Sequence, residues 1–228
     1  MNAVYDLSRY PANFNFTDFL AMASAHGADH VIFTFSKGDF VPKYPRKVAE
    51  ERLESILKPA CALWGMTYSF GNGEGIDPGY EWGKLIKTYH QLGRIGKPKS
   101  VLEPKKEKYT VTIRNYDRFE KRNSLKDAWL RFADEIGAFV IDEWYDKPLD
   151  LQERMAYYAG AEMNFSVGNG PASLFLFSDL PYRLFMKTDY EYLERQGLPF
   201  GSQFPWANEN QKIVWCEDTY ENIRKVWP

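Results

Sequence analysis

The segment 114–123 concentrates groups that bind anions. Four cations fall within nine residues, together with amide side chains; in chain order the residues are Arg114, Asn115, Arg118, Lys121, Arg122 and Asn123. A guanidinium can hold two oxygens of one phosphate or carboxylate through parallel N–H bonds. The segment therefore indicates an anion-binding loop, although a solvated basic loop with Asp117 and Glu120 as surface partners fits the same composition.

A second stretch, 162–178, has the pattern of a strand, a tight turn and a helix. Apolar and polar residues alternate from 163 to 167, glycines follow at 168 and 170, and an apolar run begins at 171. The N–H groups at the start of a helix attract anions, and proline is favoured at the first helical position. This turn is either an anion site or an ordinary turn with good helix-start chemistry; its candidate residues are Asn169, Gly170, Pro171 and Ala172.

Three further polar or aromatic residues are candidates for the same site. Asp142 and Trp144 follow an expected strand at 139–141. Asn208 lies in the polar run 204–211, which also contains Trp206. This run could close over a sugar or a base, or it could be an ordinary surface connection.

These candidates are positioned by alternating strands and helices. Strands are expected near 3–7, 30–35, 66–70, 109–113, 139–141, 163–167, 182–186 and 213–215. Helices are expected at 16–26, 45–64, 80–92, 124–136, 149–160 and 218–227, and one starts at Pro171. Asn15 or Thr17 is expected to cap the first helix and Asn123 or Ser124 the fourth, while Pro59 should kink or divide the second. Such alternation predicts parallel sheets with crossover helices, an α/β fold.

A segment rich in Pro, Gly and Lys, 93–108, divides this pattern near the middle of the chain. We expect two Rossmann-like domains, 1–95 and 109–228, with the first one reduced. Ligands of open parallel sheets sit beyond the carboxyl ends of the strands. The loops after 113, 141 and 167 should therefore converge on one edge, where Arg114 and the turn at Gly170 could hold one diphosphate between them.

Composition and charge exclude several classes of protein. The chain of 228 residues is 44% hydrophobic and 17% aromatic, enough for a buried core. Its 29 basic and 31 acidic residues give a net charge of -2, so we expect no nucleic-acid partner. Cys61 and Cys216 have neither disulfide nor zinc-site spacing and are expected to be buried free thiols. No run of about 18 apolar residues and no signal-peptide pattern occurs, which indicates a soluble cytoplasmic protein without a membrane span.

Known cofactor and nucleophile motifs are also missing from the sequence. There is no G-x-G-x-x-G after the first strand, no G-x-x-x-x-G-K-[ST] and no G-x-S-x-G. His26, His30 and His90 are scattered, and no Asp-x-Asp pair that would bring a divalent ion occurs. We therefore expect a site without metal or cofactor.

The second half resembles the donor-binding domain of glycosyltransferases with the two-domain GT-B fold. The turn Asn169-Gly170-Pro171 is similar to the glycine-containing helix start on which those enzymes hold a nucleotide-sugar diphosphate. Thr112-Ile113-Arg114, and Arg122-Asn123-Ser124 leading into a helix with Trp129, resemble fucosyltransferase-like members. The resemblance covers about 109–228, and no residue of the first half matches a catalytic base of the family.

This resemblance implies a metal-independent glycosyltransferase that moves a sugar from a nucleotide-diphosphate donor to an acceptor, a glycan or a small molecule. Arg114 and the N–H groups from Gly170 to Ala172 would then stabilise the charge of the leaving diphosphate. Asp6 and Asp39, which follow expected strands, are candidate bases. Two alternatives stay open: a non-catalytic nucleotide- or sugar-binding module, and a nucleotide-sugar epimerase.

Overall fold

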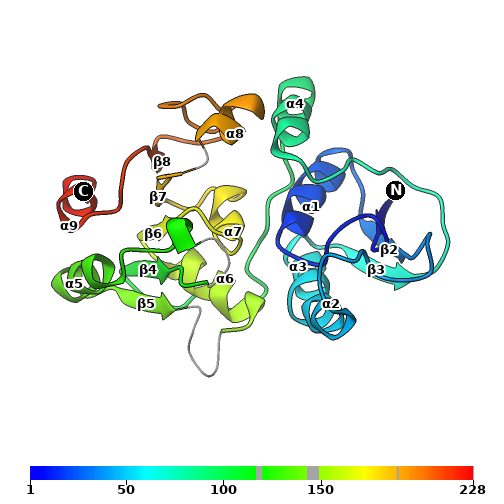
Figure 1. The fold of residues 1–228 in the computed structure, drawn as a ribbon, viewed down its shortest axis with the longest axis horizontal. Coiled ribbons are helices and arrows are strands. Elements are labelled where there is room, and N and C mark those ends of the chain that lie inside the picture. The colour runs from blue at the N-terminus through cyan, green and yellow to red at the C-terminus, as the bar shows by residue number, and fades with distance from the viewer. Residues whose placement is uncertain (117–119, 143–148, 189, 228) are drawn as a thin grey trace. The chain divides into compact units, whose positions relative to one another are not determined.

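The computed structural model describes residues 1–116, 120–142, 149–188 and 190–227. The chain divides into two compact units, Met1–Val101 and Leu102–Pro228, and each contains one parallel β-sheet covered by helices (Figure 1). The sheet of the first unit has three strands and that of the second has five. The predicted α/β class, with two parallel sheets and a reduced first half, is confirmed.

The first unit is built on the sheet order β1-β2-β3. Its elements are β1 (Asn2–Asp6), α1 (Asn15–Ala25), β2 (His30–Thr34), α2 (Arg46–Arg52), the π-helical segment η1 (Leu53–Leu57), α3 (Lys58–Leu63), β3 (Thr67–Phe70) and α4 (Trp82–Leu92). The ring of Tyr5 on β1 packs edge-on against Phe16 and Phe19 of α1 at 4.7 and 5.0 Å. Pro59 cannot donate a helical hydrogen bond, and the change to π-helical geometry lies just before it, in place of the expected kink.

The second unit has the sheet order β5-β4-β6-β7-β8, and all neighbouring strands are parallel. Its strands are β4 (Tyr109–Ile113), β5 (Phe139–Asp142), β6 (Met163–Val167), β7 (Tyr182–Phe185) and β8 (Gln211–Val214). Its helices are the 3-10 turn η2 (Glu120–Arg122), α5 (Lys126–Ile136), α6 (Leu151–Gly160), α7 (Ser173–Leu176), α8 (Tyr190–Arg195) and α9 (Tyr220–Lys225). The short helix α8 was not expected from the sequence.

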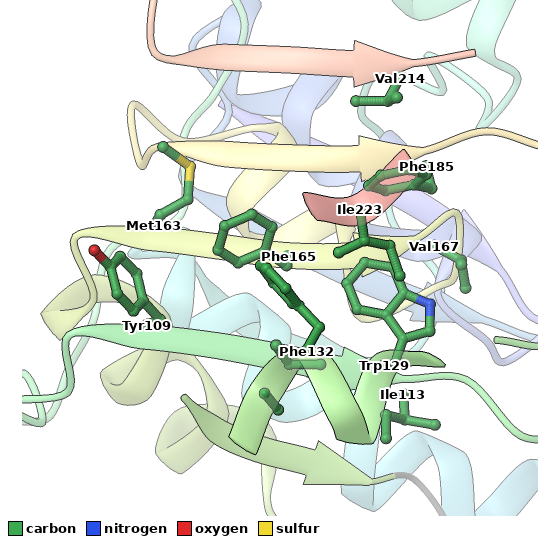
Figure 2. Packing of buried hydrophobic residues seen from close by; sticks show 12 residues of the cluster. Tyr109, Ile113, Trp129, Phe132, Met163, Phe165, Val167, Phe185, Val214 and Ile223 are labelled. Carbon is green, nitrogen blue, oxygen red and sulfur yellow. The ribbon is translucent and has the colours of Figure 1, made fainter. Parts of the chain in front are cut away.

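One face of this sheet carries the apolar core that Figure 2 shows. Trp129 and Phe132 of α5 and Ile223 of α9 pack onto alternate residues of the strands, among them Phe165 and Phe185. Phe132 meets Phe165 edge-on at 5.2 Å, and Trp129 meets Phe185 at 5.4 Å. Burying such rings is the main source of stability in this layer.

The opposite face is buried too, but its residues on the central strands β4 and β6 are polar. Thr110 Oγ1 donates to Asn164 Oδ1 at 2.6 Å, so β4 and β6 are joined by their side chains as well as their backbones. Tyr158 of α6 lies with its hydroxyl 2.8 Å from Thr112 Oγ1, and its carbonyl accepts from Asn164 Nδ2 at 3.2 Å. The ring of Tyr158 meets Phe175 of α7 at 5.0 Å. Helices α6 and α7 therefore cover this face, where the side chains of Thr110, Thr112 and Asn164 are paired by hydrogen bonds.

The expected linker is held by both units rather than free. Gly96 N–H donates to Ala21 O at 2.7 Å within the first unit. Lys105 N–H donates to Ala156 O at 3.0 Å within the second. The first part of the segment 93–108 thus belongs to the first unit and its last part to the second.

Both expected pairs of helix caps are wrong. At α1 the Asn15 N–H donates to the Asn13 side chain and Thr17 Oγ1 donates to Phe14 O, so neither expected residue caps it. At α5, Ser124 Oγ accepts instead from Arg114 N–H at 2.8 Å, and the Leu125 N–H is taken by Asp218 at 2.8 Å. At α5 the cap is displaced by a contact with Asp218, 93 residues away, which local sequence does not reveal.

Candidate functional site

The chain places β5 on one side of β4 and β6 on the other, so the direction of strand addition reverses between β4 and β6. Loops leave such a switch point in opposite directions, and the crevice at the carboxyl ends of the two strands is the usual ligand site of open parallel sheets. The register pairs Thr112 with Ser166, so Arg114 and Gly168 follow at corresponding positions. The basic loop and the glycine turn therefore leave the same edge of the sheet, at the switch point.

Arg114 is fixed at this edge by its own backbone. Its N–H donates to Ser124 Oγ at 2.8 Å, and its carbonyl accepts from the Ser124 N–H at 2.9 Å. The side chain is 8% exposed, and its guanidinium lies 5.5 Å from the centre of the Tyr116 ring. A positive charge held in such low-dielectric surroundings interacts with an anion more strongly than a solvated one does.

Arg122 joins the basic loop to the glycine turn. Its Nη2 donates to the Gly168 carbonyl at 3.4 Å, across 46 residues of sequence. Gly168 itself is needed for packing, because a Cβ there would lie 2.9 Å from Met186 Sδ. The structure thus brings together the two segments that the sequence singled out.

Of the other candidates in the basic loop and on β5, Asn123 and Asp142 have partners within the protein. Asn123 bonds the backbone of Tyr116 twice, accepting from its N–H at 3.0 Å and donating to its carbonyl at 3.1 Å, so it shapes the loop. Asp142 ends β5 and lies 3.2 Å from Lys126 Nζ. Asn115 follows Arg114 and is half-buried. Arg118 and Trp144 lie outside the described residues.

The turn from Asn169 to Ala172 is closed by the Asn169 side chain. Asn169 Nδ2 donates to Ser166 Oγ at 2.9 Å, and its Oδ1 accepts from the Ala172 N–H at 2.8 Å. The Ala172 N–H that we expected to face an anion is therefore already bonded, because asparagine readily caps its own turn. Helix α7, which follows Pro171 and Ala172, has only four residues and contributes little dipole.

Asn208 is not brought to this edge. Its Oδ1 accepts from Asn210 N–H at 2.9 Å, and its Nδ2 donates to Asp179 O at 3.3 Å. The Asn210 carbonyl in turn accepts from Tyr182, the first residue of β7. Asn208 therefore lies at the amino edge of the sheet, opposite Arg114.

The two carboxylates expected as bases in the first unit, Asp6 and Asp39, lie in different surroundings. Asp6 Oδ1 accepts from Ser8 N–H at 2.9 Å and from Ser36 N–H at 3.2 Å, and Ser36 Oγ bonds the second oxygen. Although burial raises the pKa of Asp6, these hydrogen bonds lower it more and leave it below its usual range. Asp39 is exposed and pairs with Arg46 at 3.6 Å.

Asp18 is the carboxylate that sequence reasoning missed. It lies in the first turn of α1, the helix that follows β1, and is 4% exposed. Burial raises its pKa well above the usual range, and a hydrogen bond with Trp82 opposes that shift. Only the structure reveals it: α1 is buried on nearly all sides, so its one acidic residue is not solvated.

The described residues contain no group of three or more His, Cys, Asp or Glu side chains that could hold a metal ion. Cys61 is buried and Cys216 half-buried, and both are free thiols. None of the helices in the described ranges has the length and hydropathy needed to span a bilayer.

The sequence matches no protein-family model and no curated protein. Among solved structures, the E. coli heptosyltransferase WaaC with ADP-2-deoxy-2-fluoro heptose is similar with a TM-score of 0.50 and 10% identity, over 99% of this chain and 98% of that chain. The iron-containing dodecameric glycosyltransferase TibC from enterotoxigenic E. coli has a TM-score of 0.39 and 13% identity, over 99% and 72%. A glycosyl transferase family 9 protein from Veillonella parvula has a TM-score of 0.40 and 11% identity, over 98% and 88%.

At this level of identity the likeness to WaaC is one of fold. Together with the two parallel sheets, it identifies a reduced GT-B-like architecture of the kind found in glycosyltransferases. Function has to be argued from the site.

Proposed function

We propose that this chain is a metal-independent glycosyltransferase that binds the diphosphate of a nucleotide sugar at the carboxyl edge between β4 and β6. The observation that carries the proposal is the parallel pairing of these strands, Thr112 with Ser166, at the switch point of the sheet. It puts a buried arginine and the glycine turn on the same edge. The alternative of a solvated basic loop fits less well with a guanidinium that is 8% exposed.

In the proposed reaction the donor's diphosphate is the leaving group. Arg114 stabilises the negative charge that develops on it, and Arg122, already bonded to Gly168, keeps a second cation beside the turn. Asn115, Arg118, Asp142, Trp144 and the turn residues Asn169, Gly170 and Pro171 complete the proposed donor site. We leave Asn208 out of it because of its place at the amino edge.

The donor class is supported from two directions. The resemblance of 109–228 to fucosyltransferase-like donor domains suggests a nucleotide-linked deoxy sugar. The fold likeness to WaaC, whose structure contains an ADP-heptose analogue, suggests an adenine nucleotide. Both are nucleoside diphosphate sugars, so the shared part of the proposal is the diphosphate, and the acceptor is a glycan or a small molecule.

Sugar transfer to a hydroxyl also needs a group that accepts its proton. We assign this role to no residue of the first unit. Asp18 is buried in α1 and is 4% exposed, Asp6 is fully hydrogen-bonded, and Asp39 pairs with Arg46.

Calorimetric titration of UDP, GDP and ADP against the wild type and Arg114→Ala tests the donor site. We expect at least one nucleotide to bind the wild type and Arg114→Ala to weaken it about 10- to 100-fold, the effect of losing one or two charge-assisted hydrogen bonds. Arg195→Ala, a change at an exposed arginine of α8, is the control and should leave the affinity unchanged.

Absence of heat with all three nucleotides, or an affinity indifferent to Arg114→Ala, would refute the donor site. Mass spectrometry of reactions with the corresponding nucleotide sugars then separates the functions that share it. Binding without any product would indicate a binding module, and epimer formation without an acceptor would indicate an epimerase.

A further inference from the structure

Arg154 of α6 is buried without a counter-charge among the described residues. Arg154, in the first turns of α6, is 5% exposed, and its Nη1 is buried with no hydrogen-bond partner among the described residues. It takes part in none of the ion pairs that link the described residues, whereas Lys187, equally buried, lies 2.7 Å from the carboxylate of Asp218. The two buried cations are therefore in different situations.

An unpaired buried arginine requires an explanation because it cannot become neutral by losing a proton. A lysine in such a place can lose its proton, but the guanidinium pKa is too high for that. Removing a lasting positive charge from water is strongly unfavourable unless an anion pairs with it. Among the residues that the structure describes, Arg154 is thus a buried cation without its anion.

The position of Arg154 follows from the contacts of Tyr158. The two residues are four apart in α6, so they share one face of the helix. Because α6 connects the parallel strands β5 and β6, it runs opposite to them, and Arg154 lies about 6 Å nearer the carboxyl edge than Tyr158. Tyr158 contacts Thr112. Arg114 lies two strand residues beyond Thr112, which is about 6.6 Å further towards the carboxyl edge. Arg154 is therefore level with Arg114.

A second unsatisfied polar atom lies on the same face of the sheet. Ser173 begins α7, just after the glycine turn, and is 7% exposed; its Oγ is buried and has no hydrogen-bond partner in the described ranges. Helix α7 packs on α6 through Phe175 and Tyr158, and Ser173 lies two residues from Phe175 on the side of the carboxyl edge. A hydroxyl donor and a guanidinium are the groups that bind phosphate oxygens.

We propose that Arg154 and Ser173 bind a phosphate group at the carboxyl edge of the second unit, on the face covered by α6 and α7. In identifying that group as part of the donor diphosphate, this inference rests on the proposed function; the anion site itself does not. It adds a further arginine and a hydroxyl to the residues that hold the leaving group, and it explains two buried polar atoms without a partner among the described residues.

Inorganic pyrophosphate is the probe, titrated calorimetrically against the full-length wild type, Arg154→Met, Ser173→Ala and the control Arg195→Met. Methionine keeps most of the volume and apolar character of the arginine stem. We expect Arg154→Met to weaken pyrophosphate binding about 10- to 100-fold. Ser173→Ala should weaken it less, and Arg195→Met should leave it unchanged.

Thermal unfolding of the ligand-free proteins gives an independent readout, because Arg154→Met should lower the affinity for pyrophosphate but not the melting temperature. Since an uncompensated buried charge is removed, Arg154→Met should melt at the same temperature as the wild type or higher, and pyrophosphate should no longer raise it. A melting temperature well below that of the wild type would show that the guanidinium supports the fold, and would overturn the proposal.

The nucleotide titrations separate this proposal from the function on which it rests. If ADP, GDP or UDP binds in an Arg114-dependent way while Arg154→Met keeps full affinity for both the nucleotide and pyrophosphate, the donor site stands and this inference is wrong. If pyrophosphate binding depends on Arg154 but no nucleotide binds, the anion site stands and the transferase proposal falls. A wild type that does not bind pyrophosphate refutes the anion site.

Discussion

At the scale of single residues, Asp18 shows how strongly burial changes a carboxyl group. Its helix is apolar on nearly every side, and this environment raises the pKa well above the usual range, while Trp82 opposes the shift. In the unfolded chain the same group ionises at about pH 4. The folded state therefore holds the proton to higher pH than the unfolded state does.

This difference predicts a specific pH dependence of stability. Below about pH 4 Asp18 is protonated in both states and has no effect; as the pH rises towards the folded-state pKa, ionisation of the unfolded state lowers the free energy of unfolding by up to about 1.4 kcal/mol per pH unit. Asp18→Asn removes this contribution. Urea unfolding from pH 3 to 8 measures this effect: the free energy of unfolding of the variant should rise relative to that of the wild type as the pH rises. A difference in free energy of unfolding that is constant across this range would contradict the raised pKa.

At the scale of elements, Asp218 ties α5 to the ends of two strands. Its Oδ2 accepts from Leu125 N–H at 2.8 Å and from Trp129 Nε1 at 2.7 Å, and its Oδ1 pairs with Lys187, two residues beyond β7. Asp218 is fully buried, so all three contacts are made away from water. The start of α5, and with it Ser124 beside Arg114, depends on this carboxylate.

We expect Asp218→Asn to lower the free energy of unfolding by up to about 3–5 kcal/mol, because the neutral amide removes the 2.7 Å ion pair of Lys187 and leaves it only the exposed Glu217 carboxylate at 4.0 Å. Chemical denaturation measures this effect. Asp134→Asn, at an exposed position of α5, is the matched control and should change stability little. An Asp218→Asn protein as stable as the wild type would mean that Lys187 finds another partner.

The same elements show what local sequence can predict. Alternating apolar residues identified β4 and β6 because every second side chain enters the core shown in Figure 2. The start of α5 was misjudged because its first N–H is bonded by Asp218, 93 residues away, while the serine expected to cap it holds Arg114 instead. The sequence correctly predicted a turn at Asn169-Gly170, but the Ala172 N–H was expected to be available to an anion. It is not, because it donates to the Asn169 side chain.

At the scale of the whole molecule, the fold class was predictable and the membership of the site only partly so. Strand and helix alternation is enough to predict two parallel sheets, and residues that follow a strand, such as Arg114, are placed at the carboxyl edge by that rule alone. Asn208 precedes a strand, so the rule would have excluded it; its inclusion rested on composition. Arg154 and Asp18 sit within helical patterns, and their importance appears only once burial is known.

The most direct test of the central claim is a crystal structure of the protein soaked with the nucleoside diphosphate that binds best in calorimetry. We expect the diphosphate at the carboxyl edge between β4 and β6, within hydrogen-bonding distance of the Arg114 guanidinium and beside the turn at Gly170. Density for the nucleotide at the amino edge, near Asn208, or away from the second unit's sheet altogether would contradict the account.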